Sequence, residues 1–162
     1  MALLIENRYQ RALVSLRLKT SDIDRGLTKV QRSFVNILSE NVDATAAFYE
    51  RLLNMKRHFD SDWFVILTHA GVKDLEYGIL QRNHHIVPES VRAKPAGIIV
   101  TFVVSDCDSV HKRAVEMGAD IVEPPTDMPY GQRRMLALDP EGTLIDISAP
   151  TAPVRNVLTR PS

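Results

Sequence analysis

The stretch "LALDPEGTLIDISAP", residues 136–150, holds two apolar runs joined by a tight D-P-E-G turn. Its second run places one acidic residue, Asp146, among Leu144, Ile145 and Ile147. A carboxylate in an apolar strand costs free energy unless another group pairs with it. The stretch therefore predicts two strands joined by a turn. It also raises the question of whether Asp146 faces a metal ion, a ligand, another side chain or water.

Working outward from this hairpin, the same order of elements occurs twice: a strand, a helix and three more strands. The helix cap is Asn41 or Asp43 in the first copy and Asp106 or Asp108 in the second, and Gly118 ends the second helix. The expected strands are 33–38, 57–61, 62–69, 75–81, 97–104, 119–125, 133–139 and 142–148, and the expected helices are 44–55 and 109–117. This repeat predicts an α+β fold in which two βαβββ modules form a curved mixed sheet around a cavity.

The repeat also predicts the domain organisation. We expect a single domain at 33–149, with one module at about 33–82 and the other at about 97–149. Residues 82–97 contain two prolines and lack periodicity, which indicates a loop. Apolar residues at helical spacing predict an amphipathic helix within the extension 1–32, for packing or dimer contact. Residues 150–162 form a C-terminal tail.

The composition narrows the classes of function. The 162 residues carry 20 Lys plus Arg and 20 Asp plus Glu, so the chain lacks the basic excess that nucleic acids and anionic membranes attract. A single cysteine, Cys107, excludes an internal disulfide and a cysteine-rich zinc site. No apolar run is long enough to span a bilayer, and the opening residues lack a cleavable signal pattern. We expect a cytoplasmic protein without nucleic-acid or membrane partners.

Two longer stretches carry a family resemblance. They are "VNILSENVDATAAFYERLLNM" in the first copy and "VTFVVSDCDSVHKRAVEMGADIVEPPTDMPYGQRRMLALDPEGTLIDIS" in the second. The F-Y-x-x-x-L helix and the G-Q-R-R…D-P-x-G-x-x-I-D ending resemble the vicinal oxygen chelate superfamily. This group includes glyoxalase I, bleomycin and fosfomycin resistance proteins and extradiol dioxygenases. The resemblance covers about residues 33–149 and implies a homodimer, but the fold hosts several activities.

The resemblance also implies where a metal would bind. Enzymes of this superfamily hold a divalent cation with His or Glu from the first and last strand of each copy. These positions fall on Phe34 and Val100 in the first strands, and on Glu76 and Asp146 in the last strands. Two of these four corners are apolar, whereas a cation needs at least three N or O ligands. We therefore expect no metal and no other cofactor, and if a metal binds, its ligands are Glu76 and Asp146.

Other reactive residues favour structural roles. The histidines are typical of surface positions, and His69 and His85 are the two best placed to line a cavity mouth. Cys107 lies near a helix N-terminus, where a thiol pKa can fall, but without a neighbouring histidine a structural role is favoured. Either Arg133 or Arg134 would stand at the cavity mouth, to hold a ligand carboxylate or to pair with Asp146. Trp63 either stacks on a ligand or fills the core.

These observations support two hypotheses about function. The preferred hypothesis is a metal-free protein that sequesters an apolar or aromatic molecule between its modules. Seven residues are then expected to line the site: Asn36, Trp63, Tyr77, Phe102, Tyr130, Arg133 and Asp146. The alternative is a metal-dependent lyase or isomerase related to glyoxalase I, which would polarise a carbonyl and abstract a proton. An interaction module with a filled cavity is a third, simpler reading.

Overall fold

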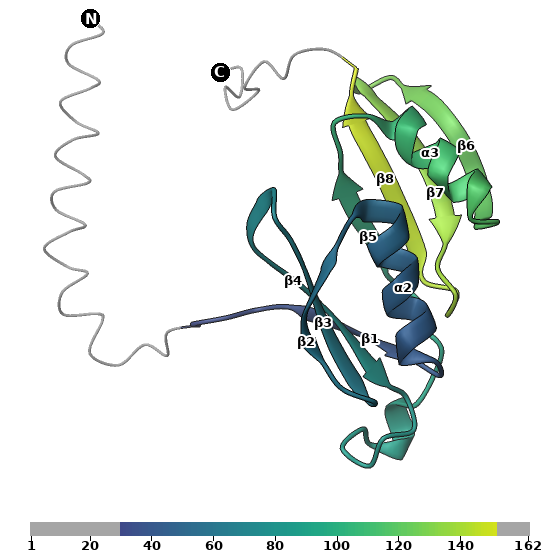
Figure 1. Cartoon of the computed structure of the whole chain (residues 1–162). Helices are drawn as coiled ribbons and strands as arrows, with labels where there is room; N and C mark the ends of the chain where they lie inside the picture. The colour runs from purple at the N-terminus through teal and green to yellow at the C-terminus, as the bar shows by residue number, and fades with distance from the viewer. Residues whose placement is uncertain (1–29, 152–162) are drawn as a thin grey trace, which may run out of the picture. The chain divides into compact units, whose positions relative to one another are not determined.

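The computed structural model describes residues 30–151, and residues from Phe34 onward belong to one compact unit. Its first module contains β1 (Val35–Ser39), α2 (Val42–Leu53), β2 (Lys56–Asp60), β3 (Phe64–His69) and β4 (Val72–Gln81). The strands form a mixed sheet in the order β1-β4-β3-β2. β1 runs parallel to β4, and the other neighbours are antiparallel. This is the first βαβββ unit that the sequence predicts (Figure 1).

The second module repeats this arrangement. It contains β5 (Ile99–Val103), α3 (Cys107–Glu116), β6 (Asp120–Met128), β7 (Gln132–Leu138) and β8 (Leu144–Pro150). The sheet order is β5-β8-β7-β6, with β5 parallel to β8. The loop between the modules holds one short 3-10 helix, η1 (Glu89–Val91), which the sequence did not predict. The α+β fold of two βαβββ modules is confirmed, and the two sheets curl without closing.

Both helices begin at a side chain that accepts a hydrogen bond. The Asn41 side chain accepts from the Ala44 amide at 3.0 Å, and Asp106 accepts from the Ser109 amide at 3.1 Å. Each bond satisfies an amide that the helix itself leaves unpaired. The alternative caps, Asp43 and Asp108, lie in the first turn of the helices.

The strand β6 tolerates two consecutive prolines, Pro124 and Pro125, because it lies at the edge of its sheet. Its pairing with β7 shifts register on both sides of Glu123. A proline has no backbone N–H to donate, and at this edge none is required on the free side. The prolines therefore leave the strand assignment intact.

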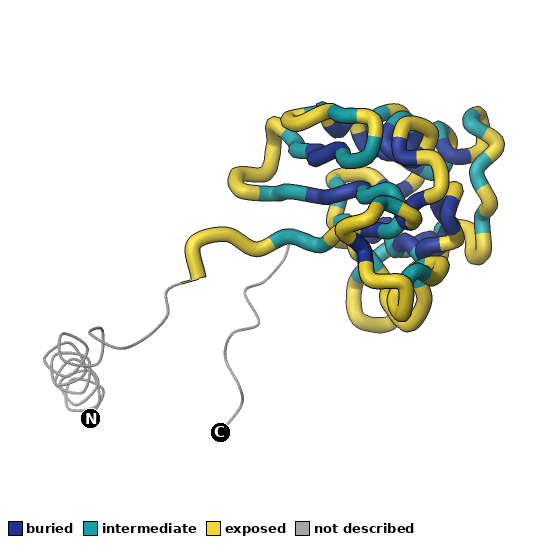
Figure 2. The backbone as a smooth tube through the Cα atoms, turned by 90° about the horizontal axis from the view of Figure 1, so that it is seen from below, coloured by how far each residue is buried: buried dark blue, intermediate teal, exposed yellow. Residues whose placement is uncertain are grey.

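One hydrophobic core joins the two modules. Alternate residues of the strands turn toward the helices, which gives Tyr77 and Ile79 from β4 and Ile145 and Ile147 from β8 to this core. In Figure 1, α2 lies beside the strands of its own module, and the second module lies above it. Figure 2 shows buried segments inside the folded unit, with exposed backbone along its loops. The remaining strand residues lie on the faces of the sheets that point away from the helices.

The expected amphipathic helix of 1–32 and most of the tail 150–162 lie outside the described residues. Within residues 30–151, no helix combines the length and apolar character that crossing a membrane would require.

Candidate functional site

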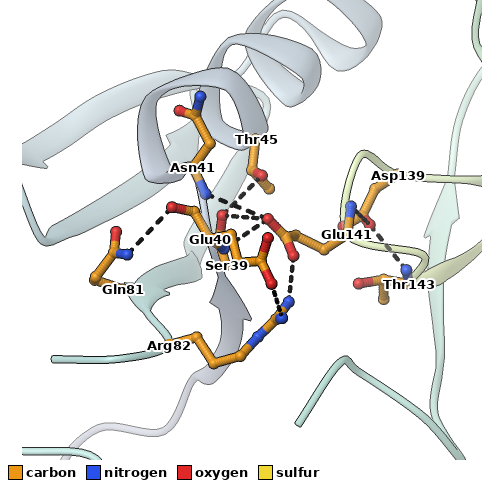
Figure 3. Close-up of polar contacts among 9 residues, drawn as sticks. All are labelled: Ser39, Glu40, Asn41, Thr45, Gln81, Arg82, Asp139, Glu141 and Thr143. Atoms are coloured by element: carbon orange, nitrogen blue, oxygen red, sulfur yellow. Dashed lines mark hydrogen bonds and ion pairs between the residues drawn. The ribbon is translucent and has the colours of Figure 1, made fainter. Parts of the chain in front are cut away.

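A buried polar network joins the D-P-E-G turn to the start of α2 (Figure 3). The Glu141 carboxylate accepts hydrogen bonds from the Ser39 hydroxyl at 2.9 Å and from the Glu40 and Asn41 amides at 2.7 and 3.3 Å. It also forms an ion pair with Arg82, and both side chains are only 7% exposed. The Glu141 carboxylate of the second module thus lies at the N-terminus of α2 in the first module, where a negative charge is stabilising.

The environment of Glu141 favours its charged form. Burial alone would raise its pKa, but the hydrogen bonds from Ser39, Glu40 and Asn41 and the charge of Arg82 together hold the pKa below the ordinary value. A second carboxylate, Glu40, reaches Arg82 from the exposed side at 2.6 Å. This network is a structural junction, because groups of the chain itself satisfy the Glu141 carboxylate, although the buried Arg82 Nε has no hydrogen-bond partner among the described residues.

Asp139 shapes the turn and ties it to α2. Its carboxylate accepts from the Glu141 and Thr143 amides at 2.9 and 2.8 Å, and from the Tyr49 hydroxyl at 2.8 Å. The Tyr49 hydroxyl also lies 3.0 Å from that of Tyr77. Burial raises the pKa of both phenols, and they stay protonated at neutral pH. These groups fix the position of the turn.

Asp146 lies beside an arginine. Its carboxylate oxygen is 3.2 Å from the Arg134 Nε, and the two side chains are 16% and 21% exposed. The atoms are close enough for an ion pair but lack the alignment of a hydrogen bond, and the other carboxylate oxygen has no hydrogen-bond partner in the described part of the chain. The arginine that pairs with Asp146 is therefore Arg134. Arg133 instead pairs with Asp108 and Asp127 at 2.8 and 3.0 Å.

The sequence led us to place a metal-ligand position at Val100, and this placement is wrong by one residue. Val100 packs against the core, whereas Asp146 alternates with the core residues of β8 and lies on the opposite face. The residue paired with Asp146 across the parallel strands is Thr101. The error arose because a single-residue shift in a strand exchanges its faces.

These residues do not fit the family's metal centre. Phe34 has no donor atom, Thr101 offers only a neutral hydroxyl, and Arg134 places a cation at Asp146. Among residues 30–151, no group of three His, Cys, Asp or Glu side chains is arranged to hold an ion.

The other residues expected to line a ligand site do not gather in one place, although Tyr77 and Phe102 contact each other. Tyr77 is 3% exposed within the core, and Phe102 packs against its ring at 5.9 Å. Tyr130 is 62% exposed. Trp63 stacks on His84, with ring centroids 4.2 Å apart. Asn36 is exposed and lies over Gly78, where an added Cβ would come within 2.0 Å of its Oδ1.

A pocket of about 780 Å³ opens at the other end of α2, where the two modules also meet. Its apolar wall comes from the end of α2, from β4, from β5 and from α3. The residues of this wall are Leu53, Met55, Val72, Leu75, Phe102, Val103, Val104 and Val110. Of the seven residues expected to bind a ligand, the pocket contains Phe102 alone. It also contains His69, which the sequence placed at a cavity mouth.

The pocket has three titratable side chains, those of Arg113, Asp106 and His69, and four neutral polar ones, those of Asn54, Thr101, Ser105 and Ser109. Arg113 is half-buried, and its Nε donates to the Leu52 carbonyl at 3.1 Å. Asp106 accepts from the Ser109 hydroxyl and amide, and these bonds, aided by the charge of Arg113, lower its pKa. His69 accepts from the Gly71 amide through Nδ1 at 3.0 Å, so in the neutral ring Nε2 is the hydrogen-bond donor.

Sequence reasoning missed Arg113, because it lies in a helix segment, "HKR", that is typical of a solvated face. Only the packing of α3 against α2 makes this arginine a pocket residue. Cys107 is 1% exposed, and its thiol donates to the Ile147 carbonyl at 3.4 Å. Burial, assisted by the nearby Asp108 charge, raises its pKa, which agrees with the favoured structural role.

The fold and the paired modules define a class of protein. The family model described as Glyoxalase/Bleomycin resistance protein/Dioxygenase superfamily matches residues 31–147. The chain belongs to this superfamily, as the resemblance of its two motifs implied.

Solved structures support the same fold. A glyoxalase/bleomycin resistance protein/dioxygenase family enzyme from Burkholderia phytofirmans PsJN superimposes with a TM-score of 0.63 at 20% identity, covering 72% of this chain and 96% of that one. A superfamily member from Sphaerobacter thermophilus gives a TM-score of 0.62 at 22% identity, covering 76% and 99%. These identities establish similarity of fold alone.

Two curated relatives are more similar in sequence. They are the anthracycline biosynthesis proteins DnrV of Streptomyces peucetius and DauV of Streptomyces sp. strain C5, each 49% identical over 117 residues. The match covers 67% of this chain and 38% of each relative. The chain thus matches well under half the length of these proteins.

Proposed function

We propose that this protein binds a small apolar or aromatic molecule in the pocket at the end of α2 and holds it without converting it. The observation that carries this proposal is the pocket itself, whose volume of about 780 Å³ lies within the usual range for small-molecule sites. Its walls come from both modules and combine eight apolar residues with seven polar ones. That combination suits a flat ligand with polar groups at one end.

The relatives indicate the class of ligand to try first. DnrV and DauV are named for anthracycline biosynthesis, and anthracyclines are flat polycyclic aromatic molecules. A ring system of this kind would bury its faces against Phe102 and the aliphatic wall, which contributes about 25 cal/mol for each Å² of apolar surface removed from water. Anthraquinone-2-carboxamide is a suitable neutral probe.

The test compares two valine-to-tryptophan variants. Val72 lines the pocket and is 49% exposed, whereas Val122 on β6 is 50% exposed and does not line it. We expect Val72→Trp to fill the pocket and weaken probe binding at least about tenfold. Val122→Trp should bind like the unmodified protein. If both variants bind equally, or the unmodified protein does not bind the probe, the proposal fails.

The alternative is a metal-dependent lyase or isomerase of the glyoxalase type. Membership of a superfamily that includes glyoxalases supports this alternative. It would need a ligand set beyond Glu76 and Asp146. Metal-dependent turnover of a glutathione hemithioacetal that Asp146→Ala abolishes would establish it. Absence of turnover with metal supplied would exclude that substrate.

We also propose that the protein forms a homodimer, as the superfamily resemblance implies. The support in this chain is apolar surface at the start of the edge strand β5, where Ile98 and Ile99 are 39% and 53% exposed. Light scattering at micromolar concentration should give twice the mass of the chain. A monomeric mass would contradict the dimer and leave the proposed ligand pocket untouched.

A further inference from the structure

We infer that the ligand of the pocket carries an acidic group, which Arg113 binds at the position that Glu141 occupies in the other half of the molecule. This inference rests on the proposed function and adds the charge of the ligand to it. The two modules meet each other at two places, the network around Glu141 and the pocket.

The two junctions are built from equivalent elements. The network around Glu141 combines the end of β1, the start of α2 and the hairpin turn of the second module, between β7 and β8. The pocket combines the end of β5, the start of α3 and the hairpin turn of the first module, between β3 and β4. Exchanging the modules therefore exchanges the network and the pocket.

The hairpin turns differ in what they contribute. In the second module, the connection 139–143 folds against α2 and supplies the Glu141 carboxylate. In the first module, β3 and β4 stay paired out to His69 and Val72, and the turn between them is Ala70 and Gly71. This short turn has no carboxylate to place against α3. The pocket lies at the place that the Glu141 side chain fills in the other junction.

Arg113 supplies the cation at the pocket. Its Nε is held by the Leu52 carbonyl, which orders the guanidinium without using its terminal nitrogens. Within the described part of the chain, those nitrogens make no hydrogen bond or ion pair. They can thus offer two parallel N–H donors to a carboxylate, the geometry in which arginine binds such groups best.

Asp106 carries a negative charge in the pocket, and this charge would repel an acidic ligand. It caps α3, as the neutral Asn41 caps α2, and both residues lie at the same place in their junctions. The other titratable residue of the pocket, His69, can donate through Nε2. An Asp106→Asn substitution keeps the cap, since asparagine caps helices as well as aspartate does, and removes the repulsion.

The experiment measures binding of two probes, anthraquinone-2-carboxylate and anthraquinone-2-carboxamide, by isothermal titration calorimetry. The unmodified protein should bind the acid about tenfold more tightly than the amide. Arg113→Gln should abolish this preference, so that the variant binds the acid no more tightly than the amide. Asp106→Asn should strengthen acid binding relative to amide binding about threefold. Thermal melts verify that both variants fold.

Each outcome decides the inference. Equal binding of the acid and the amide by the unmodified protein would overturn it and leave the proposed function standing. Retention of the preference in Arg113→Gln would also overturn it. If Arg113→Gln does not fold, Asp106→Asn still decides, because an unchanged preference for the acid would contradict the predicted repulsion. Failure of both probes to bind would overturn the proposed function together with the inference.

Discussion

Replacing Glu141 with glutamine should destabilise the protein far more than the same change at Glu40, although both carboxylates pair with Arg82. Glu141 is 6% exposed, and its carboxylate also accepts three hydrogen bonds, from Ser39, Glu40 and Asn41. The Glu40 side chain is 66% exposed, and water screens its ion pair. The two variants thus remove the same charge from one arginine in two different environments.

The magnitude follows from the burial of Arg82, whose side chain is 7% exposed. Breaking a buried ion pair costs about 3–5 kcal/mol. Glutamine retains one acceptor oxygen, and we expect about 3 kcal/mol for Glu141→Gln, or about 6–12 °C in the melting temperature. Glu40→Gln should cost less than about 1 kcal/mol. Urea unfolding monitored by circular dichroism measures both.

The same variant tests the charge of Glu141 through pH. Because its pKa is lower in the folded state than in the unfolded state, its contribution is present above the unfolded value of about 4.3. The contribution is lost as the pH falls through the folded pKa. The difference in stability between the unmodified protein and Glu141→Gln should therefore shrink on acidification below about pH 4. An equal cost for Glu40→Gln and Glu141→Gln, or a difference independent of pH, would refute this reasoning.

Three further predictions concern the junction and the core. Tyr49→Phe removes the hydroxyl that Asp139 accepts and should cost about 2 kcal/mol in urea unfolding, whereas an unchanged midpoint would show that this bond contributes nothing. Gly142 has φ 85°, and Gly142→Ala should cost about 1–2 kcal/mol in the same assay unless the turn relaxes. Cys107 should react with a water-soluble disulfide reagent only on unfolding, because it is buried and its pKa is raised. Rapid labelling of the native protein would contradict its burial.

The fold could be predicted from the sequence because short local patterns indicate each element of the repeat. Alternating strands, the capping residues Asn41 and Asp106 and the D-P-E-G turn are each readable within a few residues. The strand with Pro124 and Pro125 was also predicted, although its place at a sheet edge was not. These features depend on neighbours along the chain.

The side-chain contacts described above join different strands, helices and turns, and local patterns do not contain such contacts. The sequence offered an arginine as a partner of Asp146, but choosing Arg134 over Arg133 required the face of β7. Glu141 looked like a turn residue until the other module placed Ser39 and Arg82 around it. The segment that contains Arg113 is typical of a solvated helix face, and only the packing of α3 beside α2 places this residue in the pocket. In each case the deciding partner is distant in sequence.

The location of a bound ligand tests the central claim most directly. Amide and methyl chemical shifts of the isotope-labelled protein can be followed by NMR during titration with anthraquinone-2-carboxamide. Our account predicts that the largest changes fall on residues of the pocket wall, including Leu75, Phe102, Val104 and Val110. Changes centred instead on Arg134 and Asp146, on the sheet face away from the helices, would contradict it, as would spectra that do not change.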